Sequence, residues 1–386
     1  MPAKGAHTVT SVVIVGGGVI GLSVGWRAAG HGLAVTVLDP RPASGASHAS
    51  AGMLTPAAEA AYAERDLFTL GIESMARWPG FAAELTALTG QETGLRREGT
   101  MQVAYDSSDQ AVLAEMQALR ESFGAPGQWL TGREARAQEP LLAPGVRSAL
   151  LTPDDGSVDP RLVTRALLAA LDRCGATVIR RQVAEISASN DRVSGVLLAD
   201  GSQLEADWVV LAAGAYSPMV AGLPAGSAPP VRPVKGQILR LRATPSTGLV
   251  RRTISAVVRG ARVYLVPRDS GELVVGATQE EVGHDTQVTA GGVWQLLRDA
   301  QAVVPSITEL SFGEACAGLR PGTPDNEPVL GPSELPGLVL ATGHFRTGVL
   351  LAPVTAEIVA GFLATKHLSP LATPFMPGRF AGLASS

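Results

Sequence analysis

Residues 12–21 read Val-Val-Ile-Val-Gly-Gly-Gly-Val-Ile-Gly, and this stretch decides the fold. Four apolar residues predict a buried strand that ends in the spacing Gly16-x-Gly18-x-x-Gly21 before a helix. Gly16 allows a tight turn, Gly18 lets a pyrophosphate approach the main chain, and Gly21 lets the helix pack closely on the strand. The unpaired N–H groups and the positive dipole end of that helix suit phosphate. The stretch therefore predicts a unit that binds a dinucleotide.

An acidic residue completes this pattern. Asp39 follows the apolar segment Val35-Thr36-Val37-Leu38 and lies about 20 residues beyond the glycines. At the end of a second strand, its carboxylate can accept hydrogen bonds from a ribose hydroxyl. Three glycines alone occur in many proteins, but the glycines and the acid at this distance together predict dinucleotide binding.

The same stretch is similar to three other patterns, and its context argues against each. The apolar run 12–30 is similar to a signal peptide or a membrane span, but it contains several glycines and an arginine and lacks a small-residue cleavage site. Residues 21–25 match the G-x-S-x-G pattern of serine hydrolases, yet Ser23 falls inside the predicted helix and not on the turn after the strand. Gly17-x-x-x-Gly21 matches a pattern found where two membrane helices pair, but this pattern has meaning only in a membrane span, which the composition of 12–30 argues against. We therefore expect Ser23 to be a packing residue.

Composition limits the classes of function. The chain has 386 residues, enough for two domains or one elaborated domain, and 46% of them are hydrophobic, so a large core is available. A formal net charge of -4 gives no electrostatic reason to expect nucleic acid or an anionic membrane as a partner. Cys174 and Cys316 are the only cysteines, which fits a reducing cytoplasm. The six histidines are scattered without metal-ligand spacing, so we expect no metal.

Helices and a ligand-wrapping loop follow the glycine unit. The small residues of 43–53 lack hydrophobic periodicity and predict a loop, which suits close wrapping of a ligand or an ordinary surface position. Asp159 and Pro160 predict the cap and first turn of a helix that runs through Ala170. Helical spacing also covers 64–90, 108–122, 291–303 and a stretch from about Gly348.

Strand patterns fall into two groups. One group fits a parallel sheet with a hairpin beside it, at 177–179, 183–186, 193–198, 203–204, 207–214 and 338–342. The buried strand before Gly214 fits a second contact between that sheet and the cofactor. The other group fits antiparallel strands, at 237–241, 253–258, 263–267 and 272–277, after a proline-rich crossing at 224–234. The cofactor sheet is therefore expected to be discontinuous in sequence.

Seven motifs in a fixed order carry a resemblance to a known family. They are Gly16 to Gly21, Ser50-Ala51-Gly52-Met53-Leu54, Val234-Lys235-Gly236, Tyr264-Leu265-Val266-Pro267-Arg268, Val275-Gly276-Ala277-Thr278, Gly318-Leu319-Arg320-Pro321-Gly322-Thr323 and Gly343-His344-Phe345-Arg346-Thr347-Gly348. With these motifs the chain resembles the D-amino-acid oxidase superfamily of FAD enzymes, and most closely the glycine oxidases of thiamine (thiazole) biosynthesis. The similarity runs over most of the chain.

The resemblance implies an α/β fold class with a discontinuous Rossmann-type FAD-binding domain and an antiparallel-sheet α+β substrate domain. We expect 1–78, 149–224 and 318–386 to form the FAD-binding domain, and 79–148 and 225–317 to form the substrate domain. The resemblance also implies FAD contacts at Val19, Ile20, Asp39, Pro40, Ala46, Ser47, Ala51, Gly52, Met53, Val183, His344, Phe345, Arg346, Thr347, Gly348, Val349 and Leu350.

The resemblance further implies that Tyr264, Arg320 and Arg346 face the substrate. An amino-acid carboxylate must be held while its α-carbon faces the flavin, and arginine offers a planar two-pronged donor for that group. Arg320, braced by Pro321, is our first choice. Tyr264 fits either a second donor to the carboxylate or a core tyrosine, and Arg346 fits contact with either substrate or flavin.

The expected reaction is hydride transfer from the α-carbon of glycine, sarcosine or a small D-amino acid to flavin. The product imine would be hydrolysed to an oxo-acid and ammonia, and molecular oxygen would be reduced to hydrogen peroxide. The resemblance also implies a role in thiamine thiazole synthesis. We also expect a homo-oligomer. The family's glycine oxidases commonly carry methionine where this chain has Gln279, a departure that we expect to alter the pocket wall. Cys316 and His48 are out of register with the residues that tether FAD in sarcosine-type enzymes, so we expect non-covalent FAD.

Three alternatives stay open. One is a D-amino-acid dehydrogenase that passes electrons to a membrane quinone. The second is an FAD enzyme that acts on a glycine-like group of transfer RNA, although the charge balance offers no basic face for RNA. The third is a flavin-binding protein without catalytic turnover, which the presence of Arg320 and Tyr264 argues against.

Overall fold

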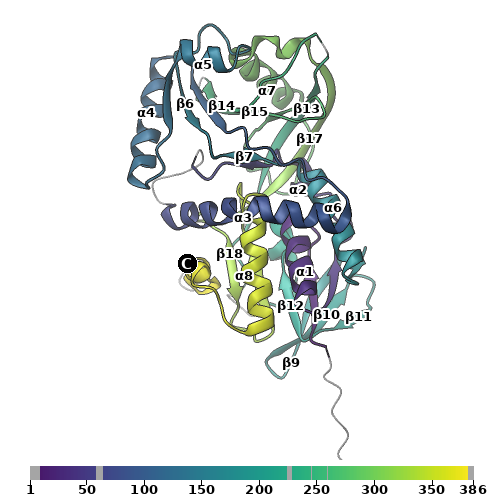
Figure 1. Cartoon of the computed structure of the whole chain (residues 1–386). Helices are drawn as coiled ribbons and strands as arrows, with labels where there is room; N and C mark the ends of the chain where they lie inside the picture. The colour runs from purple at the N-terminus through teal and green to yellow at the C-terminus, as the bar shows by residue number, and fades with distance from the viewer. Residues whose placement is uncertain (1–8, 58–63, 224–227, 245, 259, 381–386) are drawn as a thin grey trace, which may run out of the picture.

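A six-stranded sheet forms the lower half of the molecule in Figure 1. The computed structural model describes residues 9–380 except 58–63, 224–227, 245 and 259. The strand order is β18-β19-β12-β1-β2-β8, with parallel pairs except at β18. The strands are β1 (Ser11–Val15), β2 (Ala34–Leu38), β8 (Thr177–Ile179), β12 (Trp208–Leu211), β18 (Val329–Pro332) and β19 (Leu338–Thr342). Because β1 lies at the centre, the connections run outward from it in both directions, which makes its carboxyl end a switch point where ligands bind.

Both faces of this sheet are buried, which explains the continuous apolar run of β1. Val12 and Ile14 pack with helices on one face, whereas Val13 and Val15 pack with a small antiparallel sheet on the other. The helices are α1 (Val19–Gly30), α3 (Arg65–Thr89), α6 (Pro160–Arg173) and α8 (Ala352–Thr365). The small sheet is β9 (Val183–Ser189), β10 (Arg192–Leu198) and β11 (Gln203–Glu205). Alternate side chains of a strand point to opposite faces, so a strand covered on both sides is apolar throughout.

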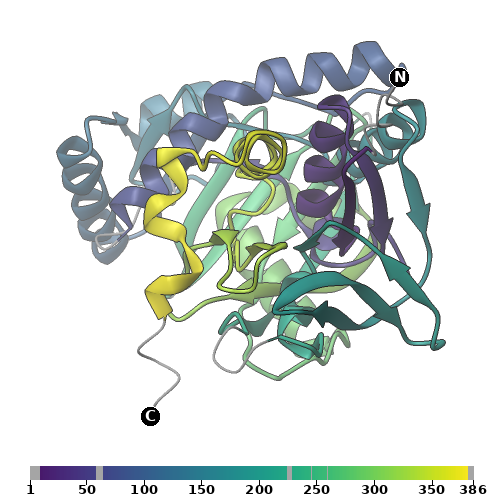
Figure 2. The same ribbon diagram turned by 90° about the horizontal axis from the view of Figure 1, so that it is seen from below.

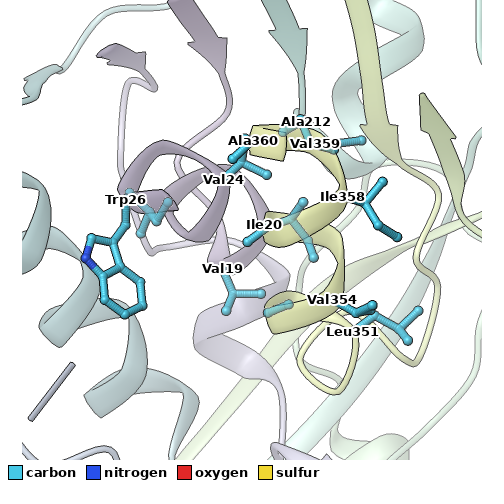
Figure 3. Packing of buried hydrophobic residues seen from close by; sticks show 14 of the residues in the cluster. Val19, Ile20, Val24, Trp26, Ala212, Leu351, Val354, Ile358, Val359 and Ala360 are labelled. Carbon is cyan, nitrogen blue, oxygen red and sulfur yellow. The ribbon is translucent and has the colours of Figure 1, made fainter. Parts of the chain in front are cut away.

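Helices α1 and α8 pack against each other beside the glycine turn. In Figure 3, Ile20 and Val24 of α1 point toward α8, and Val24 lies beside Ala360; the two helices share one buried core. The sequence pattern predicted that α8 would begin near residue 348, and this start was four residues too early. The main chain first makes a separate turn over 347–351, and regular helical bonds start only at α8.

An eight-stranded sheet forms the upper half of the molecule. Its order is β17-β13-β16-β15-β14-β4-β6-β5, and only β14 and β4 run parallel. The strands are β4 (Thr100–Ala104), β5 (Gln128–Thr131), β6 (Ser148–Thr152), β13 (Arg232–Arg242), β14 (Thr253–Val258), β15 (Ala261–Pro267), β16 (Glu272–Gly276) and β17 (Ser311–Gly322). Helix α7 (Ala290–Val303) packs on one face through Leu296 and Ala300, and α4 (Ser107–Ser122) and α5 (Gly132–Gln138) lie near the β4–β6 end.

The structure confirms the α/β class with a second, mainly antiparallel sheet. Asp159 caps α6 by accepting hydrogen bonds from the main-chain N–H groups of Arg161 and Leu162, as the sequence predicted. The expectation of a plain loop at 43–53 was wrong in detail. The segment contains one helical turn, α2 (Ala46–Ala49), and β3 (Met53–Leu54), which pairs with β7 (Gly156–Ser157). Residues this small and polar give no periodicity from which so short a helix can be recognised.

Helix α3 extends across both regions and crosses residue 78, the expected domain limit, without a break. Phe81 and Leu85, beyond that limit, pack in the same core as Leu70 of the first half of the helix. At its other end Phe68 contacts Phe123, which follows α4, at 5.1 Å between ring centroids. Figure 2 shows the helix running along one side of the molecule, past α8. No helix in the described part of the chain has the length and apolar character needed to cross a membrane.

Candidate active site

The glycine turn after β1 is packed against main chain on two sides. Gly16 has a φ of +111°, and a Cβ atom there would lie 2.4 Å from the carbonyl oxygen of Ala212 on the neighbouring strand connection. A Cβ atom on Gly21 would lie 2.0 Å from the carbonyl oxygen of Gly16. Both approaches are far shorter than real contacts, so the fold itself requires these two glycines. They confirm the tight turn and the close helix–strand packing that the sequence predicted.

Gly18 differs from Gly16 and Gly21 because the surrounding protein atoms leave room for a side chain at this position. A Cβ atom there would meet only the Ser47 hydroxyl oxygen, at 3.4 Å, which is an ordinary contact. The residue is the N-cap of α1, where main-chain N–H groups lack helical partners. A glycine that the chain itself does not need fits a ligand that must approach the main chain closely. The turn therefore fits the pyrophosphate of a dinucleotide.

The acid and the serine near this turn already have main-chain partners. The Asp39 carboxylate accepts hydrogen bonds from the N–H of Gly17 at 2.7 Å and of Arg41 at 2.7 Å, one on each oxygen. Ser47 accepts a hydrogen bond from the N–H of Val19 at 2.9 Å. Each carboxylate oxygen has two lone pairs, so Asp39 keeps capacity for the predicted ribose hydroxyl. Its second role, bracing the glycine turn, was not predicted.

The other predicted cofactor residues lie around the same edge of the six-stranded sheet. Gly214 follows β12, Pro40 follows β2, Ile20 lies in the first turn of α1 and Val183 begins β9. Ala46 belongs to α2, and Ala51, Gly52 and Met53 lead into β3. His344, Phe345, Arg346, Thr347, Gly348, Val349 and Leu350 connect β19 to α8. The carboxyl ends of parallel strands meet at one edge, which brings together residues so distant in sequence. Their individual contacts with a cofactor stay predictions.

The connection from β19 to α8 is anchored to both regions. The carbonyl oxygen of Leu350 accepts hydrogen bonds from the Trp78 ring N–H at 2.9 Å and the Ser74 hydroxyl at 2.6 Å, both on α3. The N–H of Phe345 donates to the carbonyl oxygen of Pro321 at 2.9 Å, which ties the connection to β17. The His344 ring lies 3.1 Å from the Thr355 hydroxyl, and burial lowers its pKa to about 3, so the ring is neutral.

Three arginines hold the segment that contains α2 and Ala51. The carbonyl oxygen of His48 accepts hydrogen bonds from Arg161 Nε at 3.1 Å and Arg240 Nη2 at 3.5 Å. The carbonyl oxygen of Ala51 accepts one from Arg268, whose pKa burial lowers to about 10. Sequence reasoning missed this network. Only Arg268 gave a signal, because it ends the motif that begins at Tyr264.

One cavity of about 100 Å³ opens beside this segment and brings the three substrate candidates together. Tyr264, Arg320 and Arg346 all line it, together with Met53 and Gln279. The remaining lining residues are Thr55, Thr100, Gln102, Val103, Asp109, Val112, Leu113, Met116, Ser255, Ala256, Val257, Arg262, Ala277 and Thr278. Sequence analysis did not assign those from β4, α4 and β14 to the site, because β14 and β4 approach Tyr264 only through strand pairing and α4 packs on β4.

Two glycines of the eight-stranded sheet make room for the polar groups of this cavity. A Cβ atom on Gly236 would lie 2.4 Å from Nη1 of Arg320, and one on Gly276 would lie 2.4 Å from the Tyr264 hydroxyl oxygen. Nη1 of Arg320 also donates to the carbonyl oxygen of Thr278 at 3.1 Å. The two side chains therefore lie flat across neighbouring strands, and their positions depend on glycine beneath them.

A dinucleotide-binding edge beside a cavity with cationic donors fits a nucleotide-dependent oxidoreductase that acts on an anionic substrate. Comparison with known families agrees with this class. The family model described as DAO, FAD dependent oxidoreductase, matches residues 11–361. The chain belongs to this family, and its cofactor is FAD.

Individual relatives narrow the comparison. The chain is 35% identical to the bifunctional protein ThiO/ThiG of Synechocystis sp., over 97% of this chain and 54% of that protein, so it spans about half the length of this relative. It is 35% identical to a glycine oxidase of Geobacillus kaustophilus, over 96% of this chain and 97% of that protein. The crystal structure of glycine oxidase from Geobacillus kaustophilus superimposes with a TM-score of 0.87 at 32% identity, covering 96% of this chain and 99% of the other.

Proposed function

We propose that this protein is an FAD-dependent oxidase of glycine and other small amines, including sarcosine and small D-amino acids. The observation that carries the proposal is the single cavity in which Arg320, Tyr264 and Arg346 meet beside the segment that leads from α2 to Met53. The relatives named glycine oxidase, similar over almost the whole of both chains, support it.

The residues of the cavity provide binding and orientation. Arg320 holds the substrate carboxylate, and the Tyr264 hydroxyl donates to the same group, so that the α-carbon is directed toward the cofactor edge. Bound FAD would supply acceptance of a hydride and delivery of its electrons to molecular oxygen, which yields hydrogen peroxide. The Cα–H bond breaks as a C=N bond forms, and water converts the resulting imine to an oxo-acid and ammonia. An amine that binds unprotonated needs no protein base for this step.

The proposed FAD is non-covalent. Burial raises the pKa of Cys316, so its thiol stays protonated and is a poor nucleophile. Arg161 Nη2 lies 4.0 Å from the sulfur. Acid or denaturant should therefore release the flavin from the precipitated protein. Yellow colour that stays with the precipitate would contradict this part of the proposal.

The physiological setting that we propose is a cytoplasmic homo-oligomer in thiamine thiazole synthesis. Similarity to ThiO/ThiG proteins supports the thiazole role. The partners in turnover are a small amino-acid substrate and molecular oxygen, without metal, nucleic acid or membrane. Light scattering of the purified protein and growth of a thiamine-dependent strain that expresses the gene would check the assembly and the pathway.

Arg320→Ala tests the proposed carboxylate anchor. We expect KM for glycine to rise about 10- to 150-fold, which corresponds to the loss of roughly 1.5–3 kcal/mol from charge-assisted hydrogen bonds, while FAD stays bound. Steady-state kinetics and the flavin absorbance of the purified variant measure both. Arg242→Ala, which removes an exposed arginine outside the cavity, is the control. Unchanged KM in Arg320→Ala would remove this residue from the site.

Two further measurements separate the proposed oxidase from its alternatives. Peroxide formed under air without an added acceptor supports the oxidase, whereas turnover that requires a quinone identifies a dehydrogenase. Anaerobic bleaching of the flavin by glycine, sarcosine, D-alanine or D-proline shows catalysis. A flavin that none of the four reduces would make a binding protein without turnover the better description, and reduction only by transfer RNA would identify the RNA enzyme.

A further inference from the structure

The cavity carries more positive charge than one substrate carboxylate requires. Its lining holds three guanidinium groups, on Arg262, Arg320 and Arg346, and a single carboxylate, on Asp109. One oxygen of Asp109 already accepts hydrogen bonds from the main-chain N–H groups at the start of α4, at 3.1 and 3.2 Å. A small zwitterion such as glycine has one carboxylate, which leaves two of the three cations without an anionic partner.

Cations elsewhere on the same sheet do find acidic partners. Arg240 pairs with Glu272, and the Lys235 amine lies 2.8 Å from the carboxylate of Asp285. Within the described part of the chain, none of the three cavity arginines has a carboxylate within ion-pair distance. Arginine in a concave site without a protein counter-ion is typical of recognition of an anion on a ligand.

Arg262 is placed to reach a group beyond the reaction centre. It stands two residues before Tyr264 on β15, so the two side chains leave the same face of the sheet, about 7 Å apart along the strand. Strand register sets Tyr264 opposite Ser255 and Arg262 opposite Val257, both of which also line the cavity. Arg262 is exposed to solvent and lines the cavity from β15. A charged group of a ligand can therefore reach it from the cavity.

Part of the cavity lining is apolar. Val112, Leu113 and Met116 of α4 line the cavity on the side of β4 and β6. Such a wall suits methylene groups and offers no hydrogen bond to a polar chain. An anion at Arg262 and a carboxylate at Arg320 would thus be joined by a short aliphatic spacer.

We propose that the cavity accepts an amino acid with a second carboxylate on a short side chain, with the α-carboxylate on Arg320 and the second on Arg262. The inference rests on the proposed oxidase function and names a substrate class for it. Oxidation of D-glutamate would break its Cα–H bond, transfer the hydride to FAD and give an imine. Water would hydrolyse that imine to a 2-oxo dicarboxylic acid and ammonia, and molecular oxygen would take the electrons as peroxide.

Acidic and amide substrates of equal shape test this inference. We expect kcat/KM of the holoenzyme for D-glutamate to exceed that for D-glutamine by about tenfold, because only the acid makes a charge-assisted contact with Arg262. Arg262→Gln should reduce this ratio to near one, and Arg262→Glu should reverse it. D-aspartate against D-asparagine repeats the comparison with a spacer one methylene shorter. Arg242→Gln, outside the cavity, should keep the ratio of the parent enzyme.

Two outcomes would overturn the inference while the oxidase function stands. In the first, the enzyme oxidises glycine but has equal kcat/KM values for D-glutamate and D-glutamine. In the second, Arg262→Gln leaves the ratio of these two kcat/KM values unchanged. A binding measurement keeps the test independent of turnover. Glutarate should perturb the flavin absorbance at a concentration about tenfold lower than butyrate, and Arg262→Gln should remove that difference. Equal binding of the two acids would also overturn the inference, whereas tight glutarate binding without oxidation of any amino acid would refute only the proposed oxidase.

Discussion

Glycine has different roles in the two sheets of this protein. In the six-stranded sheet, Gly16 and Gly21 make room for main chain, at 2.4 and 2.0 Å from carbonyl oxygens. In the eight-stranded sheet, Gly236 and Gly276 make room for the ends of the Arg320 and Tyr264 side chains. A main-chain neighbour cannot move without shifting a strand, whereas the end of a side chain can rotate away. The first pair should therefore govern folding and cofactor binding, and the second should govern substrate binding alone.

The largest expected effect comes from Gly21→Ala. Its Cβ would meet the carbonyl oxygen of Gly16 at 2.0 Å, so α1 must move off β1. We expect the free energy of unfolding to fall by about 3 kcal/mol, the upper end of the typical range for overpacked core variants, and FAD to be lost. Thermal unfolding and the ratio of flavin to protein absorbance measure these effects.

Gly18→Ala is the matched partner, since its Cβ meets only Ser47 at an ordinary 3.4 Å. The melting temperature of its apoprotein should stay near that of the parent while FAD affinity falls sharply. An apoprotein destabilised as strongly as Gly21→Ala would break the distinction between glycines that the chain needs and glycines that the ligand needs.

Gly236→Ala probes the second sheet. Its Cβ would lie 2.4 Å from the Arg320 guanidinium, which must swing away from the strand. We expect KM for glycine to rise about tenfold, since a displaced guanidinium loses part of its contact, while FAD content and melting temperature change little. Gly291→Ala on α7, where no atom lies within 4 Å of the new Cβ, is the control. Loss of FAD from Gly236→Ala would show that the two regions are coupled more tightly than the contacts indicate.

His344 should make the cofactor region sensitive to acid. Burial lowers its folded pKa to about 3, below the ordinary 6.5, so the unfolded chain binds a proton that the folded chain does not. Its contribution to stability is complete above pH 6.5 and is lost as the pH falls toward 3, at up to about 1.4 kcal/mol per pH unit. The free energy of unfolding of His344→Gln should fall less steeply over this interval. Parallel pH dependences in the two proteins would contradict the assignment.

Glu327, in the connection from β17 to β18, should give the smallest effect and the opposite sign. Burial, and then the charge of Asp325, raise its pKa from 4.5 to about 7. The folded chain therefore holds a proton that the unfolded chain releases, and the stability that this gives is lost as the pH rises from 4.5 through 7. Because the side chain is only half-buried, we expect less than about 1 kcal/mol. Urea unfolding of Glu327→Gln at pH 5 and pH 8 should show no such loss.

Much of the fold was predictable because its signals are local. The glycine spacing, the acid after the second strand and the Asp159–Pro160 helix start each involve neighbours in sequence, and the structure confirms the elements that they predict. The strands β4, β5 and β6 were missed, since nothing nearby marks them as part of the second sheet. The residues of the candidate site also fall into those that local motifs predicted and those that they did not. Arg320 and Tyr264 were found through motifs, whereas Arg262 and Gln102 were found only in the assembled cavity.

The sequence by itself determined that β1, the glycine turn and α1 form a nucleotide-binding unit, because each step depends on backbone conformation and residue spacing within one short segment. The tertiary structure alone decided which side chains surround the substrate. Strand pairing brings Gln102, Ser255 and Tyr264 side by side across the eight-stranded sheet. A hydrogen-bonded register between distant segments is set by the packing of the whole sheet, and no single segment contains that information.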